Sequence, residues 1–436
     1  MVKEKLKNYT FKNSVLSFET YINEFTSKMF HEFDAKAQNI NLSLKIDDLI
    51  NGRIVNFSEN QAAWHPKYRM QGPKQNDHLH KLIKKIKKSH NLQKVNLVVI
   101  GIGGSFEGPK LLIESLNSPV TNNEHNFQFL TGSDPVEFKY KTSLLDPYET
   151  IFIISSKSFS TDETIEMLKM ALDWSPGIDH FVAITANPNE AKKYGFDNNI
   201  VSFDKEIGGR YSIWSPIAEL PLIEELPYEL FLKGGRQADK DILEDEDYIK
   251  FIKRLSFSDI WNNNIKDKNI RAVLSYIWSF RSLSDYIQQL EMESLGKQPN
   301  QESEYKKTGQ VIFGGYGPTA QHSYFQLLHQ GTQSLCADII TSKEDPNNLA
   351  YAQSITQSKL LSDGANDLKQ EERINGNVSV NLFILNKADP YTLGYLIALW
   401  EHRTFISASM LGINPFDQFG VIAGKIYTKR YIDNID

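Results

Sequence analysis

The stretch GIGGSFEGP (residues 101–109) has the residue types that let a backbone hold an anion. It follows the apolar run VNLVVI, and its glycines leave backbone amides open beside the hydroxyl of Ser105. A dinucleotide site spaces its glycines as G-x-G-x-x-G, but here Gly101 and Gly103 are followed by Phe106 at the third position. The nucleotide phosphate loop G-x-x-x-x-G-K-[ST] does not occur in the sequence. The turn therefore indicates an anion site, and both common nucleotide motifs are disfavoured.

A second loop, SSKSFSTDET (residues 155–164), gathers hydroxyl groups around Lys157. These groups belong to Ser155, Ser156, Ser158, Ser160 and Thr161. Hydroxyl donors and one ammonium group suit a phosphate monoester, which has several acceptor oxygens and a charge of about −2. Ser160 and Glu163 also match the capping box S-x-x-E, so a helix start is a competing interpretation of this loop, and one that is compatible with a ligand.

Two further segments carry charged groups suited to proton transfer beside an anion. In IGGRYSIWSP, Arg210 follows Gly209, which allows close backbone approach to a ligand; a salt-bridged surface arginine is the alternative. In QQLEMESLGK we predict a strand that places Gln289, Glu291 and Glu293 on one face, with Glu293 at its end. A carboxylate there suits a general base, and an exposed polar strand face is the alternative.

The segments GPTAQHSYFQLLHQGTQ and INPFDQFGVIAGK add two more candidates. His322 and His329 stand seven residues apart, hence on nearly the same face of an expected helix. Two histidines without a carboxylate pattern are a weak metal signal, so we expect His322, beside the Gly-Pro turn, to reach a pocket. Lys425 ends the other segment, for which a loop with a surface lysine is the alternative.

The composition is that of a folded protein without a broad basic surface. The 436 residues are 40% hydrophobic and 23% charged, near globular averages. A net charge of −6 argues against a nucleic-acid partner. The single cysteine, Cys336, excludes an intrachain disulfide and suits a reducing compartment. The N-terminus lacks an apolar signal core, and Glu401, His402 and Arg403 interrupt the best membrane candidate, so we expect a cytoplasmic chain with no membrane partner.

The pattern of apolar runs predicts an α/β fold. Between residues 95 and 204, five strand-length apolar runs alternate with helical patterns, as a doubly wound parallel sheet requires. The basic run HLHKLIKKIKKSH before them has an apolar stripe at helical spacing, so its lysines are expected on a solvated helix face. The first 75 residues are expected to be helical, since Phe18, Tyr21, Ile22 and Phe25 stand three and four apart.

A second α/β domain follows a segment rich in Pro, Gly and charge near residues 222–245. We predict a helix at IRAVLSYIWSFRSL, a helix at AQHSYFQLLHQ, strands at YIQQLEME, GQVIFGG, LCADIIT and VSVNLFIL, and an apolar core helix from Leu393. The chain is therefore divided into an N-terminal helical segment (1–75), a first domain with the phosphate loops (76–235) and a second domain with C-terminal helices (236–436).

These segments together resemble the phosphoglucose isomerase family, in its shorter bacterial form. The resemblance lies in GIGGSFEGP, SSKSFSTDET, GGRYSIWS, QLEMESLGK, GPTAQHSYFQLLHQGT and GINPFDQFGVIAGK, in the family's order, with a weaker echo at NFSENQAAWHPKYR. It implies two sugar-isomerase (SIS) domains, each with a five-stranded parallel sheet between helices, in a homodimer. It further implies the interconversion of glucose 6-phosphate and fructose 6-phosphate through a cis-enediol, with neither a metal nor another cofactor.

The resemblance also implies roles for individual residues. Glu293 would carry a proton between C2 and C1, and Arg210 would stabilise the enediolate. His322, lent by the neighbouring subunit, and Lys425 would serve ring opening. The hexose phosphate would be bound by Gly104, Ser105, Ser156, Lys157, Ser158, Thr161, Gly209, Gln289 and Gln418.

Some positions depart from the family's pattern, and two other functions stay open. The departures are Ser158, Leu295, residues 318–320, Pro415, Phe419 and residues 422–423. None removes an expected catalytic side chain. The alternatives are an isomerase for mannose or amino-sugar phosphates, which assays with those sugars distinguish, and a non-catalytic sugar-phosphate sensor. A sensor has no need for Glu293, His322 and Lys425, and the chain has no DNA-binding module.

Overall fold

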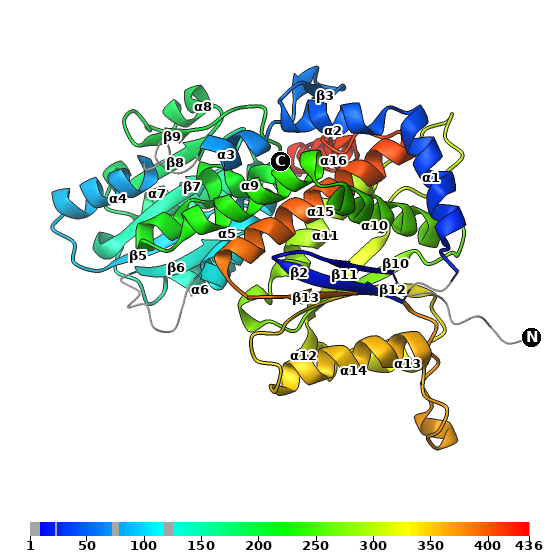
Figure 1. The fold of residues 1–436 in the computed structure, drawn as a ribbon. Helices are drawn as coiled ribbons and strands as arrows, with labels where there is room; N and C mark the ends of the chain where they lie inside the picture. The colour runs from blue at the N-terminus through cyan, green and yellow to red at the C-terminus, as the bar shows by residue number, and fades with distance from the viewer. Residues whose placement is uncertain (1–8, 22–23, 72–77, 117–124, 436) are drawn as a thin grey trace, which may run out of the picture.

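The protein contains two large β-sheets that lie next to each other, each covered by helices (Figure 1). The structure is a computed structural model that describes residues 9–21, 24–71, 78–116 and 125–435. Three helices stand in the N-terminal part of the chain: α1 (Ser27–Asn39), α2 (Leu42–Ile50) and α3 (Pro66–Gln71). A separate two-stranded pair joins β3 (Ile54–Asn56) to β4 (Gln61–Ala62).

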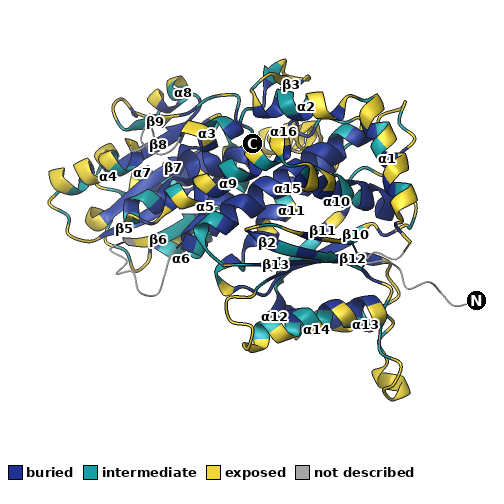
Figure 2. Ribbon diagram, viewed as in Figure 1, coloured by how far each residue is buried: buried dark blue, intermediate teal, exposed yellow. Residues whose placement is uncertain are grey.

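The first sheet confirms the predicted parallel strands between residues 95 and 204. Its order is β6-β5-β7-β8-β9, and every neighbouring pair is parallel. The strands are β5 (Val95–Ile100), β6 (His125–Leu130), β7 (Thr150–Ser155), β8 (Phe181–Thr185) and β9 (Ile200–Ser202). All residues of β7 and β8 are buried, because helices cover both faces of the sheet (Figure 2).

The helices of this sheet begin just after its strands. They are α5 (Glu107–Leu116), α6 (Pro135–Thr142), α7 (Asp162–Trp174) and α8 (Pro188–Lys192). The basic run before the sheet forms α4 (His78–Ser89), which buries Leu79, Ile83 and Ile86. Most of its lysines are exposed, which confirms the predicted solvated face.

The second sheet has six strands rather than the five that the resemblance implies. Its order is β1-β2-β13-β12-β10-β11. The last four strands are parallel, whereas β2 is antiparallel to both of its neighbours, β1 and β13. The strands are β1 (Tyr9–Lys12), β2 (Leu16–Thr20), β10 (Ile270–Ser275), β11 (Val311–Tyr316), β12 (Leu335–Ser342) and β13 (Ser379–Leu385). Its outer face is covered by α14 (Leu349–Asp363) and two short helices (Figure 1).

Two predicted helices are strands in this sheet. Phe18 lies in β2, where its ring contacts Phe251 and Phe383, so the helix expected from residue 18 to residue 25 is wrong; Ile22 lies outside the described residues. The segment IRAVLS, expected to begin a helix, forms β10. In both cases pairing with distant strands decides the structure, since β2 pairs with β13 and β10 pairs with β11 and β12.

The predicted strand at YIQQLEME is also wrong, because these residues lie in helix α11 (Leu283–Leu295). Helical geometry keeps Gln289 and Glu293 on one face but turns Glu291 to the opposite side. There Glu291 is buried, forms an ion pair with Arg271 of β10 and accepts a hydrogen bond from the Trp400 indole at 3.0 Å. Glu291 is thereby a structural residue, distinct from Glu293.

Long helices lie between the two sheets. α15 (Pro390–Leu411) is buried along nearly its whole length, as predicted for the apolar segment, and packs along α9 (Tyr228–Glu244). Close contact is possible because a Cβ at Gly234 would lie 1.8 Å from the Tyr391 carbonyl oxygen. Among the described helices, none combines the length and apolarity of a membrane span. The boundary predicted between the first and second domains, at residue 235, falls within α9. This helix therefore contains residues of both predicted domains.

Candidate active site

A cavity of about 670 Å³ opens at the carboxyl ends of the first sheet's strands. Every predicted site residue except His322 lines it. These residues are Gly104, Ser105, Ser156, Lys157, Ser158, Thr161, Gly209, Arg210, Gln289, Glu293, Gln418 and Lys425. They come from both halves of the chain, so the fold brings the separate motifs to one place.

The hydroxyl loop after β7 has a defined backbone that turns its polar groups into the cavity. Phe159 has a left-handed φ of 54°, and its amide donates to the Ser156 hydroxyl at 3.1 Å. The Ser160 hydroxyl donates to that of Ser158 at 2.9 Å instead of capping a helix. Thr161, not Ser160, is the N-cap residue before α7, and its side chain makes no capping bond. The capping-box interpretation is therefore wrong, and the hydroxyls are available to a ligand.

Lys157 brings a positive charge into this loop without a matching partner. Its ammonium group makes no hydrogen bond or ion pair within the described part of the chain. Burial lowers its pKa from the ordinary 10.5, although nearby Glu59 acts against this shift. An incoming anion would supply the missing counter-charge. The loop therefore favours a negatively charged ligand group.

The glycine turn and the arginine segment meet at the cavity wall. Gly103 has a left-handed φ of 56°. A Cβ at Gly104 would lie 1.9 Å from the carbonyl oxygen of Gly209, closer than real contacts allow. The Ser212 hydroxyl donates to the Gly104 carbonyl at 3.1 Å. Glycine at 104 is thus needed for the two loops to touch, which places Arg210 beside the glycine turn.

Arg210 is buried and held by hydrogen bonds from all its nitrogens. Its Nε donates to Ser294 Oγ at 2.7 Å, and Nη1 donates to Gln418 Oε1 at 2.9 Å. Its Nη2 donates to the backbone carbonyls of Pro415 and Asp417. All of these acceptors are neutral groups. The hydrogen bonds therefore fix the orientation of the guanidinium without neutralising its positive charge.

Glu293 lies beside this guanidinium, and both side chains line the cavity. Its Oε2 lies 3.4 Å from Arg210 Nη1 and accepts a hydrogen bond from Gln289 Nε2 at 3.2 Å. The side chain is 29% exposed, so it reaches the cavity while part of it is buried. The strand prediction was wrong, yet Gln289 and Glu293 share a face in the helix as well, because they are four residues apart.

The other two candidates lie differently. Lys425 is on the exposed helix α16 (Ile422–Asp433) and lines the cavity. His322 is exposed and does not line the cavity of its own chain. It lies in a turn between α12 (Gly317–Ala320) and α13 (Phe325–Gln330). His322 and His329 are therefore not on one helix, contrary to the prediction.

The sequence reasoning missed the hairpin of β3 and β4 as part of the cavity wall. Asn56, Glu59 and Gln61 line the cavity, and Asn56 Oδ1 accepts a hydrogen bond from Asn414 Nδ2 at 2.9 Å. The only signal was the weak echo NFSENQ. The hairpin is held at the cavity by this contact with Asn414, which is far along the chain and could not be predicted from the local sequence. Lys205 and Glu206, which also line the cavity, were missed as well.

Comparisons with known proteins agree with this geometry. The family model described as phosphoglucose isomerase matches residues 21–436. A glucose-6-phosphate isomerase of Legionella pneumophila (strain Paris) is 35% identical over 419 residues, which cover 89% of this chain and 83% of that protein. The chain belongs to the phosphoglucose isomerase family. A glucose-6-phosphate isomerase of Shewanella baltica (strain OS155) is 33% identical over 92% of this chain and 84% of its own.

Solved structures show the same fold. A glucose-6-phosphate isomerase from Chlamydia trachomatis superposes with a TM-score of 0.85 over 98% of this chain and 90% of its own, at 22% identity. A tagatose-6-phosphate ketose/aldose isomerase from Escherichia coli gives a TM-score of 0.51 over 82% of this chain and 95% of its own, at 12% identity. Both likenesses concern the fold.

Within this family fold, the departures from the family's motifs leave the cavity's polar groups in place. Pro415 contributes its carbonyl oxygen to Arg210, so the change of side chain spares the hydrogen bond. Leu295 is the last residue of α11 and is buried. Phe419 begins the 3-10 helix before α16, Ile422 is the first residue of α16, and both are exposed.

Proposed function

We propose that the chain interconverts glucose 6-phosphate and fructose 6-phosphate. The observation that carries this proposal is that one cavity contains two groups of residues. The first is an anion loop in which the Lys157 ammonium group makes no hydrogen bond or ion pair to any described residue. The second is a carboxylate beside an arginine, Glu293 and Arg210. The first group suits the sugar phosphate, and the second suits proton transfer at carbon. Membership of the phosphoglucose isomerase family supports the same reaction.

Glu293 acts as the base in this proposal. Its carboxylate takes the proton from C2 of the open-chain aldose, and the C–H electrons form a C1–C2 double bond as the aldehyde oxygen gains charge. The same carboxyl group then returns the proton to C1, while the hydroxyl at C2 loses its proton and becomes the ketone. The products balance with a proton moving from O2 to O1, so no electron acceptor is involved.

Arg210 stabilises the charge that develops on oxygen in the enediolate. Because its orientation is fixed by Ser294, Gln418 and two carbonyls, little reorganisation is needed as the charge forms. A preorganised group of this kind contributes about 3 kcal/mol, or about a hundredfold in rate. Arg210 also attracts the carboxylate of Glu293, since Arg210 Nη1 and Glu293 Oε2 are 3.4 Å apart.

Ring opening requires two further proton carriers. We assign Lys425 to this step from its position at the cavity and His322 from its motif. Because His322 is exposed and outside its own chain's cavity, it would serve the site of a second copy in a homodimer. A reducing, cytoplasmic location is part of the proposal, because a single cysteine leaves the chain without an intrachain disulfide.

The test is a coupled assay that follows formation of glucose 6-phosphate from fructose 6-phosphate by the purified protein. Tritium at C2 of glucose 6-phosphate should appear partly at C1 of the product and partly in water, because the carboxyl proton exchanges with solvent. Complete retention of the label would contradict the enediol route. Mannose 6-phosphate and glucosamine 6-phosphate should react more slowly; faster turnover of either would favour the alternative isomerase. Binding of hexose phosphate without turnover would favour a sensor.

A further inference from the structure

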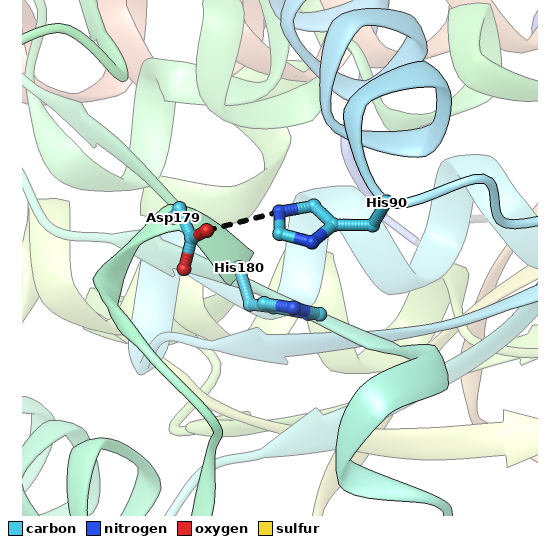
Figure 3. A group of neighbouring side chains, drawn as sticks. All are labelled: His90, Asp179 and His180. Carbon is cyan, nitrogen blue, oxygen red and sulfur yellow. Dashed lines mark ion pairs between the residues drawn. The ribbon is translucent and has the colours of Figure 1, made fainter.

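A group of metal-ligating side chains lies at the opposite end of the first sheet from the cavity. His90 follows the last residue of α4, while Asp179 and His180 form the end of a short 3-10 helix (Ile178–His180) that leads into β8. Figure 3 shows the three side chains close together. They stand before the amino end of β8, whereas the cavity lies beyond the carboxyl ends of the strands.

The spacing of the ligand atoms suits a single ion. His90 Nε2 lies 3.1 Å from Asp179 Oδ2, and one ligand atom from each of the three residues falls within 4.8 Å of the others. Two ligands of a tetrahedral Zn²⁺, each at about 2.0–2.2 Å from the ion, are about 3.3 Å apart. The first two ligands are therefore already near the required separation. His180 is held in place by its hydrogen bond, so ion binding requires the more exposed side chains of His90 and Asp179 to turn toward it.

His180 is oriented as a metal-binding histidine is. It is only 3% exposed, and its Nδ1 lies 3.0 Å from the carbonyl oxygen of Thr150. A carbonyl only accepts, so Nδ1 carries the hydrogen and the lone pair is on Nε2. Nε2 makes no hydrogen bond within the described residues. A histidine fixed through one nitrogen by a carbonyl, with the other left free, is the arrangement that supports metal ligation.

Solvent can reach the group from one side. Asp179 lines a groove of about 300 Å³ that also contains Ser89 and Asp197. The Asp179 side chain is 64% exposed and that of His90 is 25% exposed. An ion can therefore reach Asp179 from the groove and His90 from solvent, whereas His180 lies behind them.

We propose that His90, Asp179 and His180 bind a divalent transition-metal ion of the Zn²⁺ class. Two imidazoles and one carboxylate favour such an ion over Mg²⁺ or Ca²⁺, which prefer oxygen ligands. The ion links the end of α4 to the start of β8, and its role is structural because it lies away from the isomerisation cavity. It leaves the proposed mechanism free of metal.

The test is a titration of the full-length protein, first stripped with a chelator, by ZnCl₂ in competition with a chromophoric chelator. The wild type should bind one equivalent and gain thermal stability. His90→Gln and Asp179→Asn should each weaken binding at least tenfold and remove the stabilisation. Both residues are partly exposed, so these variants should fold; His180→Ala is a third test if it folds.

The matched control is His31→Gln, which removes an exposed histidine from α1 and should bind Zn²⁺ as the wild type does. Isomerase activity should be the same with and without chelator in every variant, which separates this proposal from the proposed function. Absence of saturable binding by the wild type would overturn the site. So would equal affinity of the wild type, His90→Gln and Asp179→Asn.

Discussion

Replacing Arg210 with lysine keeps a positive charge but removes its fixed geometry. The guanidinium donates to Ser294, Gln418 and two backbone carbonyls, whereas one ammonium group cannot reach all four acceptors. The charge is then free to move away from the developing oxyanion. Losing one preorganised donor at such a site costs about 3 kcal/mol, so we expect kcat to fall about a hundredfold.

The Arg210→Lys variant should bind substrate almost normally, because the phosphate loop is untouched. In the coupled assay we expect KM for fructose 6-phosphate to change by less than about threefold. Thermal unfolding must be measured beside it, since each buried acceptor left unpaired costs about 1–3 kcal/mol of stability. Arg53→Lys, which changes an exposed arginine paired with Asp47 and Asp48, is the matched control. A folded Arg210→Lys variant with kcat within about threefold of wild type would refute the role assigned to Arg210.

Three further predictions concern groups around the cavity. Because burial lowers the pKa of Lys157 below 10.5 and only its charged form attracts phosphate, kcat/KM should fall at alkaline pH, and Lys157→Arg should move that fall to higher pH; an unchanged pH profile would count against this. Ser294→Ala, which removes the acceptor for Arg210 Nε, should lower kcat about tenfold. Ser284→Ala, on the same helix, should not, because the buried Ser284 hydroxyl makes no hydrogen bond to any described residue; equal effects would exclude a positioning role. Gly104→Ala should abolish activity and lower the melting temperature, since its Cβ would meet a backbone oxygen at 1.9 Å, and wild-type values would show that the loops can separate freely.

The parts of the fold that the sequence predicted are those with local signals. The strands of the first sheet are continuous apolar runs, such as TIFIIS and FVAIT, because both of their faces are covered. The cavity loops follow directly from this, since a loop after a parallel strand must lie at the carboxyl edge of the sheet. Loop residues such as Ser105 and Lys157 could therefore be placed without further information.

The errors arose where distant residues changed the meaning of the local pattern. In α11 the buried positions Ile287, Leu290, Glu291 and Ser294 have helical spacing, but a charged residue among them hid the apolar face. Glu291 is buried only because Arg271, on β10, pairs with it. Arg271 likewise broke the apolar run of β10 itself. The buried ion pair between Arg271 and Glu291 therefore explains why both β10 and α11 were predicted wrongly.

The metal-ligating group gave no sequence signal. His90 stands far in the chain from Asp179 and His180, so no short ligand motif exists. Only the packing of α4 beside β8 brings the three side chains together. The hairpin of β3 and β4 reaches the cavity for the same kind of reason, through its contact with Asn414.

The turnover of Glu293→Gln tests the central claim most directly. Glutamine keeps the shape of the side chain but cannot accept a proton from carbon, so kcat for fructose 6-phosphate should fall by about 10²–10⁴-fold. Binding of fructose 6-phosphate, measured by calorimetry, should persist because the phosphate loop is intact, and the exposed Glu302→Gln should behave as wild type. A Glu293→Gln variant that binds substrate and retains most of its turnover would contradict the claim that this carboxylate moves the proton.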